Sequence, residues 1–507
     1  MRAMLASPSF GALDTAIVVV YLAISVAAGL LANRVVTGLT GYLVAGRSLG
    51  TALSVATMTG SELGLITVMY NAQLGYREGF KALHIGLVAG LVTLVVGVTG
   101  FVVVRLRQTG VMTIPEYYEL RFGRRTRILG GVLLALGGIL NMGLFLQVGG
   151  QFVVAVTGMS PDMLRWVMTG LLALVLVYTV LGGMVSVVLT DYVQFVVLSA
   201  GLVAMVLIVL SRPGLGMEQI VATWQQRPDE AFDPIRGHGL GYISWQAVLG
   251  FVSCAVWPTA VSRALSARDA SVVRWQLGLS SLSFLVRVLV PGFMGVAAFV
   301  FLTQAGAVVG SDGGFQLEGV AYKSIQAYPV LLREVLPIGV LGLITAAMLA
   351  AFMSTHDSYL LCWASVIARD VIAPLHPNPT DRRQLLWTRV GIVAIGAWVW
   401  VWGTCFEPKQ AVWDYLAITG AVFFTGAIAV LIPGLYWRRA SSTGAVAALI
   451  AGLSALLGLH DVRAPLGLAE WESWQVGLST LGLSVAAMVV GSLLFPDRAR
   501  PVVEVAR

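Results

Sequence analysis

The chain has 507 residues, of which 58% are hydrophobic and only 11% are charged. Soluble domains carry about 25% charged residues, so this composition excludes an ordinary soluble protein and indicates a polytopic membrane protein. The net charge of +7 could also indicate nucleic-acid binding, but the basic residues are scattered among short loops, as the positive-inside rule predicts. The three cysteines lack CxxC spacing, so they indicate neither a disulfide framework nor a zinc site.

Apolar segments long enough to cross a bilayer follow one another along the chain. The thirteen predicted spans are 11–33, 51–74, 80–105, 127–157, 161–182, 184–211, 241–262, 275–305, 336–372, 384–405, 411–437, 442–460 and 472–496. An odd number places the termini on opposite sides of the membrane, and about 20 of the 32 Lys and Arg then share the side of the C-terminus. The prediction is a multi-pass protein of the cell (plasma) membrane, with its N-terminus external and its C-terminus cytoplasmic.

The second span, 51–74, is irregular. Gly60, Ser61, Glu62 and Gly64 interrupt an otherwise helical pattern in its middle. Unwound backbone at membrane depth is tolerated where it lines a cavity or binds something, and its carbonyl groups form cation sites in secondary transporters. The spacing of Gly60 and Gly64 also fits a GxxxG helix-packing face, which stays an alternative.

The span 336–372 carries a polar cluster in the middle of an apolar helix. An ionised side chain at the bilayer centre costs roughly 2.5–3.5 kcal/mol, so the cluster is expected to face protein, water or an ion. Helical spacing brings the Ala351 carbonyl and the Ser354 and Thr355 hydroxyls together, and three neutral oxygens suit a hard monovalent cation. Alternatively, the hydroxyls bond to carbonyls one turn earlier or join helices. His356 and Asp357 point elsewhere, and at least one is expected in a separate polar network.

Four motifs carry a resemblance to a known family. They are GYLVAGRSLG (41–50), TIPEYYELRFGRRTR (113–127), YTVLGGMVSVVLTDYVQ (178–194) and AAMLAAFMSTHDS (346–358). In this order and spacing they resemble the sodium:solute symporter family, which includes sodium-coupled sugar, proline, pantothenate and sialic acid transporters. The resemblance implies an all-α, LeuT-type fold with two inverted five-helix halves in a single membrane domain. The halves would be 51–211 and 241–437, with 11–33 and 442–496 as peripheral helices.

The resemblance also implies a sodium site. Its ligands would be backbone carbonyls of the broken helix and oxygens of the polar one, namely Gly60, Leu63, Ala351, Ser354 and Thr355. Five uncharged oxygens suit Na⁺ that is held loosely enough to be released. Asp191 matches a family position on the sodium exit path, and a helix-capping aspartate is the alternative.

Other polar residues are candidates for solute binding or coupling. Glu62 could tune the cation site, contact the solute or carry a proton, which would make proton coupling possible. Arg287 could attract a carboxylate solute, extend to the membrane surface or pair with an acid. Polar side chains in membrane helices more often join helices than bind solutes. The remaining candidates are Thr67, Asn141, Gln147, Gln151, Trp257, Asp357 and Asp414.

The leading hypothesis is sodium-coupled symport of a small organic solute into the cell by alternating access. ATP-driven transport is disfavoured, because none of the only three lysines lies in a Walker A loop. The sequence lacks HExxH and its histidines are scattered, so no enzymatic activity is expected. A proton-coupled symporter that uses Glu62 and a transporter-like membrane sensor stay alternatives. The expected partners are the solute, Na⁺ and the lipid bilayer, without a cofactor, a nucleic acid or an obligatory protein partner.

Overall fold

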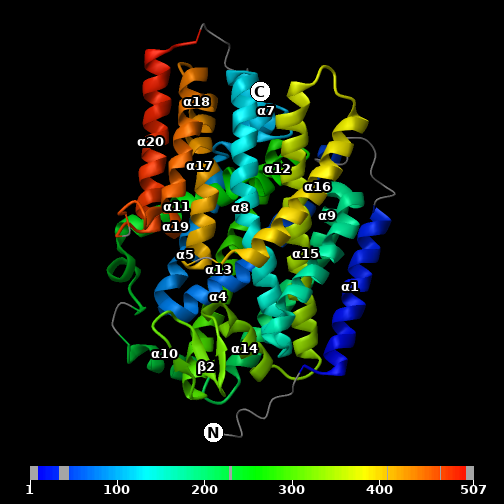
Figure 1. Ribbon diagram of the computed structural model, residues 1–507, viewed down its shortest axis with the longest axis vertical. Coiled ribbons are helices and arrows are strands. Elements are labelled where there is room, and N and C mark those ends of the chain that lie inside the picture. Colours follow the sequence, from blue (N-terminus) through cyan, green and yellow to red (C-terminus); the bar gives the residue numbers. More distant parts are fainter. Residues whose placement is uncertain (1–9, 33–44, 228–230, 408, 469, 498–507) are drawn as a thin grey trace.

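Long helices run along the longest axis of the molecule in the computed structural model (Figure 1). The structure describes residues 10–32, 45–227, 231–407, 409–468 and 470–497, without the side chains of 28–32, 45, 178 and 181–195. The helices are α1 (Ala12–Ala32), α3 (Thr51–Glu62), α4 (Leu65–Glu78), α5 (His84–Thr99), α6 (Val103–Gln108), α7 (Ile114–Phe122), α8 (Arg124–Thr157), α9 (Leu164–Leu210), α10 (Met217–Gln225), α11 (Pro234–Ala255), α12 (Pro258–Ser266), α13 (Ala270–Gln304), α14 (Ala327–Val335), α15 (Val340–Val366), α16 (Asp381–Cys405), α17 (Val412–Tyr436), α18 (Ser442–Ala451), α19 (His460–Arg463) and α20 (Ser473–Leu494).

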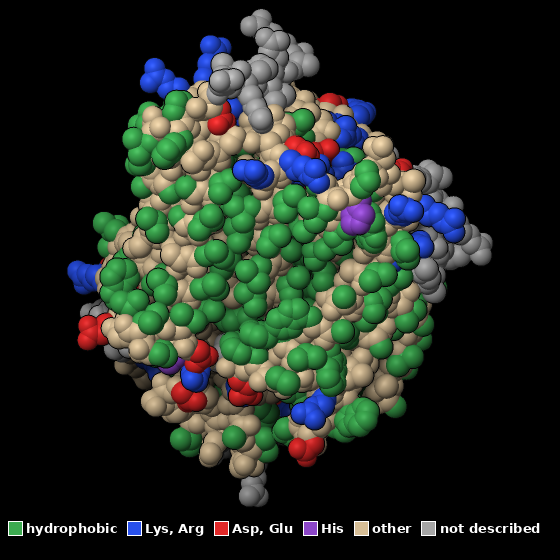
Figure 2. Space-filling model, turned by 45° about the horizontal axis from the view of Figure 1, so that its top comes forward, with side chains coloured by type: hydrophobic (Ala, Val, Ile, Leu, Met, Phe, Trp, Pro, Cys, Tyr) green, Lys and Arg blue, Asp and Glu red, His purple; other side chains and the backbone are tan. Residues whose placement is uncertain are grey.

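The helices bear out the predicted membrane character. Within the described residues, eight helices are long and apolar enough to cross a membrane, and three shorter apolar helices accompany them. Hydrophobic side chains cover the middle of the visible face, and charged side chains gather above and below it (Figure 2). The number of thirteen spans stays a prediction. The predicted spans 161–182 and 184–211 form one helical run, α9, with no assigned interruption at the predicted boundary.

A small sheet lies outside the predicted all-helical pattern. Strands β1 (Val308–Val309), β2 (Phe315–Leu317) and β3 (Val320–Tyr322) pair antiparallel in the order β1-β2-β3. They lie in the hydrophilic stretch between α13 and α14, at the end of the molecule opposite α7 (Figure 1). Because this stretch is polar and rich in glycine, it lacked the long apolar pattern on which the helical prediction rested.

Two helices are broken at their middle. Helix α3 ends at Glu62 and α4 begins at Leu65, so the predicted break in 51–74 is confirmed. Helix α11 ends at Ala255, and α12 begins at Pro258 after the extended residue Trp257. Proline is favoured in the first turn of a helix, where its missing N–H needs no partner. The second break was not predicted, although Pro258 was a signal for it.

Helix α4, the part of the first broken helix that follows the break, lies directly against α13. A Cβ at Gly75 would lie 1.9 Å from the Gly292 carbonyl oxygen, and a Cβ at Gly295 would lie 1.9 Å from the Ala72 carbonyl oxygen. Only glycine therefore fits at Gly75 and Gly295. Small residues allow such close backbone contact between membrane helices, where dispersion forces rather than the hydrophobic effect hold helices together. This contact fixes the helix after the break against the helix that carries Arg287.

The first helix caps the helix of the predicted polar cluster. Asp14 of α1 is fully buried, and its Oδ1 accepts hydrogen bonds of 2.7 Å from the backbone N–H groups of both Gly339 and Gly342. These groups belong to the start of α15, where N–H donors have no partner within the helix and a negative charge is favourable. Helix α1, predicted as peripheral, thus supplies the N-terminal cap of α15 from a distant part of the chain.

Replacing this cap is expected to destabilise the protein. In Asp14→Ala, two buried N–H donors lose a charged acceptor, which should cost about 2 kcal/mol. The measurement is the thermal unfolding midpoint of the detergent-purified protein. Asp162→Ala removes an exposed acid and is the matched control, expected to leave the midpoint unchanged. Equal midpoints for the native chain and Asp14→Ala would show that water replaces the carboxylate.

Candidate functional site

A central cavity lies between the two helix breaks. Its volume is about 100 Å³, and side chains from α3, α4, α8, α11, α13, α15 and α17 line it, together with Trp257. Aromatic rings form much of its wall: Tyr70, Phe145, Trp257, Tyr359, Trp413 and Phe424. Thr67, Asn141 and Ser253 add uncharged hydrogen-bonding groups. A largely apolar concave space with a few polar groups is the usual form of a small-molecule site.

The two charged residues of this cavity form an ion pair. Arg287 Nη1 lies 2.6 Å from Glu62 Oε2 and also donates to the Glu62 carbonyl oxygen at 3.4 Å. The two side chains are 8% and 10% exposed. Thr259 Oγ1 donates to the other carboxylate oxygen at 3.3 Å, and the guanidinium carbon lies 3.9 Å from the centre of the Phe284 ring. Pairing with an acid was one of the alternatives for Arg287, and the structure places it here.

The aromatic wall is held by specific contacts. Trp257 Nε1 donates to the Tyr359 hydroxyl at 2.8 Å, and the rings of Phe145 and Tyr359 lie 5.1 Å apart. On the other side, the rings of Tyr70 and Trp413 lie 4.9 Å apart. The position of Trp257 follows from the second helix break, because this residue precedes α12 in an extended conformation. The break therefore turns an aromatic ring into the cavity.

The first break also meets the polar helix α15. A Cβ at Gly64 would lie only 2.1 Å from Thr355 Oγ1, so the backbone of the break lies against this hydroxyl. Thr355 Oγ1 donates its hydrogen to the Ala351 carbonyl at 2.9 Å, the bond to the preceding turn that was the alternative to cation binding. A hydroxyl that donates its hydrogen keeps both oxygen lone pairs as acceptors. This bond is therefore compatible with a cation ligand.

The five predicted sodium ligands lie on these two elements. Gly60 and Leu63 lie at the end of α3, where Leu63 leaves the helical conformation at φ −94° and ψ 53°. Carbonyls in the last turn of a helix lack intrahelical donors, so the break supplies oxygen acceptors. The five predicted ligands, Gly60, Leu63, Ala351, Ser354 and Thr355, are all buried. Their number, type and burial fit a hard monovalent cation better than a transition metal.

The predicted solute contacts fall into two groups. Glu62, Thr67, Asn141, Trp257 and Arg287 line the central cavity. The other predicted contacts, Gln147, Gln151, Asp357 and Asp414, do not line this cavity.

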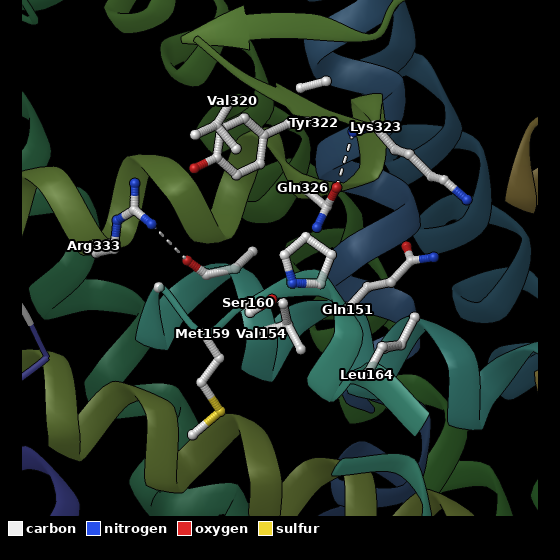
Figure 3. Close-up of a pocket in the computed structure, with 14 residues that line it drawn as sticks. Gln151, Val154, Met159, Ser160, Leu164, Val320, Tyr322, Lys323, Gln326 and Arg333 are labelled. Atoms are coloured by element: carbon white, nitrogen blue, oxygen red, sulfur yellow. Dashed lines mark hydrogen bonds between the residues drawn. The ribbon is translucent and has the colours of Figure 1, made fainter. Parts of the chain in front are cut away.

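Asn141 also joins two helices, because its Nδ2 donates to the Leu416 carbonyl at 2.8 Å. Gln147 donates to the Phe406 carbonyl at 3.3 Å and does not line the cavity. Gln151 lines a separate pocket between α8 and α14 (Figure 3). Asp414 lies in the first turn of α17 and does not line the cavity either. Gln147, Gln151 and Asp414 thus lie outside the lining of the central cavity, and their role in solute binding stays a prediction.

Asp191 lies in α9, within the stretch 181–195 whose side chains are outside the described residues. Its predicted position on a sodium exit path stays a prediction.

A separate polar network contains Asp357, as expected. Buried Arg263 of α12 donates to the Thr57 carbonyl, the Thr259 carbonyl and Ser358 Oγ at 3.3, 3.1 and 2.9 Å. Ser358 Oγ donates to Asp357 Oδ1 at 3.2 Å, so the network joins α3, α12 and α15. Asp357 does not line the central cavity.

His356 takes no part in this network. Its Nδ1 donates to the Phe352 carbonyl at 2.9 Å, and its ring packs on that of Phe352 at 3.8 Å between centres. Both rings belong to the packing between α15 and α8, where Phe145 also lies 6.0 Å from His356.

The motif 113–127 ties α7 to the end of α15. Thr113 Oγ1 and Arg127 Nε both donate to Asp370 Oδ1, at 3.0 and 2.9 Å. Arg369 Nη2 donates to Glu116 Oε1 at 2.9 Å. Asp370 and Arg369 lie in a π-helical turn, Ile367–Ile372, that continues α15. The motif thus links a loop helix by ion pairs to the helix that carries Thr355.

Weakening this link is expected to expose Cys362, which lines a small pocket together with Thr113 and Ser365. In Glu116→Gln the ion pair with Arg369 becomes a neutral contact, so α7 should separate more often from α15. We expect Cys362 to react about threefold faster with N-ethylmaleimide, in line with the energy of a partly exposed ion pair. The measurement is peptide mass spectrometry in a Cys405→Ser background, because Cys405 is exposed.

Glu218→Gln, which changes an exposed acid of α10, is the matched control. An unchanged rate in Glu116→Gln would mean that α7 and α15 stay together without the ion pair.

Comparisons with known proteins agree with this architecture. The sodium:solute symporter family matches residues 42–452. The sodium/mannose cotransporter of Bos taurus is 28% identical over 435 residues, covering 76% of this chain and 70% of the relative. The high-affinity proline transporter of Bacillus subtilis (strain 168) is 26% identical over 460 residues, covering 85% and 90%. A solved Na⁺-coupled sialic acid symporter, in a substrate-bound outward-open state, has a TM-score of 0.80 at 19% identity and covers 97% of this chain and 99% of its own.

The fold and the site define a secondary transporter of the membrane, with broken helices around a central cavity. Because the family match extends over most of its length, the chain belongs to the sodium:solute symporter family. These comparisons confirm the predicted family and the predicted LeuT-type fold. They also confirm the prediction of a sodium-coupled symporter rather than an enzyme. Sequence reasoning missed Arg263 and Thr259, because neither belongs to a recognisable motif. It also missed most of the aromatic wall, because aromatic residues are common in membrane helices.

Proposed function

We propose that the protein couples the uptake of an uncharged, hydroxyl-rich organic solute to the inward movement of Na⁺. The observation that carries this proposal is the Glu62–Arg287 pair: the only charged groups among the described lining of the central cavity lie 2.6 Å apart and neutralise each other. A charged solute would have to break this pair, whereas an uncharged one would not. Hydroxyls both donate and accept, so they suit Thr67, Asn141 and Ser253. A relative is a sodium/mannose cotransporter.

A zwitterionic solute such as an amino acid is the second candidate. One anion and one cation side by side are complementary to an ammonium and a carboxylate group, and another relative is a proline transporter. Such a solute would insert between Glu62 and Arg287.

The sodium site of the proposal consists of Gly60, Leu63, Ala351, Ser354 and Thr355. Na⁺ would hold the break between α3 and α4 against α15, and its loss to a low-sodium cytoplasm would separate them. Because the same break carries Glu62 into the cavity, sodium occupancy and solute affinity would be linked. The direct pairing of Glu62 with Arg287 favours sodium over a proton carried by Glu62 as the coupling ion. Asp191 would lie on the sodium exit path.

The proposed halves are 51–211 and 241–437, and each begins with a broken helix, which supports this division. The end with α7 would face the cytoplasm, because Arg105, Arg107, Arg121, Arg124 and Arg125 lie in or beside α6 and α7. The N-terminus would then be external and the C-terminus cytoplasmic, in the plasma membrane.

Sodium binding and solute identity are tested together. We expect Na⁺, but not K⁺ at equal ionic strength, to raise the thermal midpoint of the native protein and not that of Ser354→Ala/Thr355→Ala, because a ligand of the folded state stabilises it by mass action. Proteoliposomes with an inward Na⁺ gradient are then offered labelled D-mannose, D-glucose and L-proline. Accumulation of a hexose supports the proposal, and accumulation of L-proline alone supports the second candidate. A midpoint insensitive to Na⁺ but dependent on pH and on Glu62 would overturn sodium coupling.

A further inference from the structure

A second pocket lies at the end of the molecule that carries the sheet (Figure 3). We call it the outer pocket, lined among others by Gln151, Ser160, Tyr322, Lys323, Gln326 and Arg333. Its volume is about 590 Å³, against about 100 Å³ for the central cavity. Small-molecule sites usually measure about 300–1,000 Å³. In this structure the outer pocket has room for a small organic molecule, whereas the central cavity is below that range.

Gln151 contributes a side-chain amide to the outer pocket. The residue as a whole is 7% exposed, but its amide is not among the buried polar atoms that lack a partner, so the amide opens onto the pocket it lines. Figure 3 shows Gln151 on α8 across the pocket from Tyr322 and Gln326. The Gln326 Oε1 accepts from the backbone N–H of Lys323 at 2.9 Å, which leaves the Gln326 amide hydrogens as donors. An amide that opens onto a pocket can donate to and accept from a molecule that enters it, so Gln151 is available as a hydrogen-bonding residue there.

Both cations of the lining already have carboxylate partners. Lys323 Nζ lies 2.7 Å from Glu407 Oε1, and Arg333 Nη2 lies 2.8 Å from Glu334 Oε1. Arg333 also donates to the Ala155 carbonyl at 3.4 Å. These carboxylates offset both positive charges, so the lining has no net positive charge to attract an anionic ligand. The polar groups left for a ligand are uncharged amides and hydroxyls, and Val154, Met159 and Leu164 add apolar wall (Figure 3).

We propose that the outer pocket is a second binding site for an uncharged, hydroxyl-bearing solute of hexose size, with Gln151 as its main hydrogen-bonding residue. This rests on the proposed function in one respect, since the solute class is the one assigned to the central cavity. The pocket lies between α8, which also lines the central cavity through Asn141, and α14, which follows the sheet. Asn141 and Gln151 are ten residues apart, or about 15 Å along a helix. The outer pocket holds the solute one step from the central cavity while that cavity is small.

The test is protection of a single thiol in the purified full-length protein. Gln151→Cys in a Cys405→Ser background is alkylated in K⁺ buffer, with D-mannose, D-glucose or L-proline present, and the rate is read by mass spectrometry. We expect a saturating hexose to slow the reaction at least about fivefold and L-proline to leave it unchanged. Met163→Cys, an exposed position beside α9 that does not line the pocket, is the matched control and should react equally fast in every buffer.

Ser160→Cys provides a second reporter, because Ser160 is an exposed residue of the same lining. Adding Gln151→Leu to this variant should raise the half-protecting hexose concentration about fivefold, the loss expected for one hydrogen bond. The proposal is overturned if neither hexose protects either thiol, if Met163→Cys is protected equally, or if L-proline protects as well as a hexose. Uptake by the native chain separates the two proposals. Hexose protection without sodium-driven hexose uptake overturns only the proposed function, and uptake without protection overturns only the outer pocket.

Discussion

Gly64→Ala is expected to abolish the sodium-dependent stabilisation of this protein. The backbone at Gly64 has φ −77° and ψ 164°, which alanine adopts freely, so the substitution acts only through space. The new Cβ would lie 2.1 Å from Thr355 Oγ1 and 3.2 Å from Thr355 Cβ. Overpacking of this kind costs about 1–3 kcal/mol, and here it pushes the helix break away from α15. Because the proposed sodium ligands lie on both elements, the cation site would open.

The measurement is the thermal midpoint in Na⁺ and in K⁺, with Gly50→Ala as the matched control. Gly50 precedes α3 in a similar extended conformation, and a Cβ there meets no atom within 4 Å. Gly64→Ala/Thr355→Ala removes the clashing hydroxyl, so it should recover the midpoint in K⁺ but not the increase in Na⁺. A normal Na⁺ response of Gly64→Ala would show that sodium binds elsewhere.

Glu62→Gln is expected to lower stability by about 3–5 kcal/mol and to stop transport. The substitution leaves the Arg287 guanidinium, 8% exposed, without its countercharge inside the protein. Arg287→Met leaves the Glu62 carboxylate in the same position and should have a similar cost. The double variant Glu62→Gln/Arg287→Met leaves no unpaired charge at this position, so most of the stability should return. Transport should stay absent, because both side chains line the cavity.

These variants are compared by thermal unfolding and by sodium-driven uptake in proteoliposomes. Asp233→Asn, which neutralises an acid in a largely exposed ion pair with Arg236, is the matched control and should change stability by less than about 1 kcal/mol. Additive losses in the double variant would contradict a direct pair between Glu62 and Arg287, since two partners of one interaction cannot each lose it independently.

The local geometry around the proposed cation site could be predicted from the sequence. Glycines around Glu62 predicted a helix break, and α3 indeed ends there. Helical spacing grouped Ala351 with Thr355, and the structure joins their carbonyl and hydroxyl at 2.9 Å. The resemblance to symporters then supplied the fold, because its motifs occur in order along most of the chain. These features depend on residues within one or two helical turns, where spacing alone determines geometry.

Tertiary packing decided the remaining features of the site. Glu62 and Arg287 are 225 positions apart, and only the packing of α3 and α4 against α13 brings them together. Asn141, Gln147 and Gln151 are polar residues of one apolar helix, α8, yet of the three only Asn141 lines the central cavity. The cap of α15 by Asp14 crosses 325 positions. An apolar membrane helix is hydrophobic on nearly every side, so its sequence determines that it spans the membrane, while its neighbours determine which side chains meet.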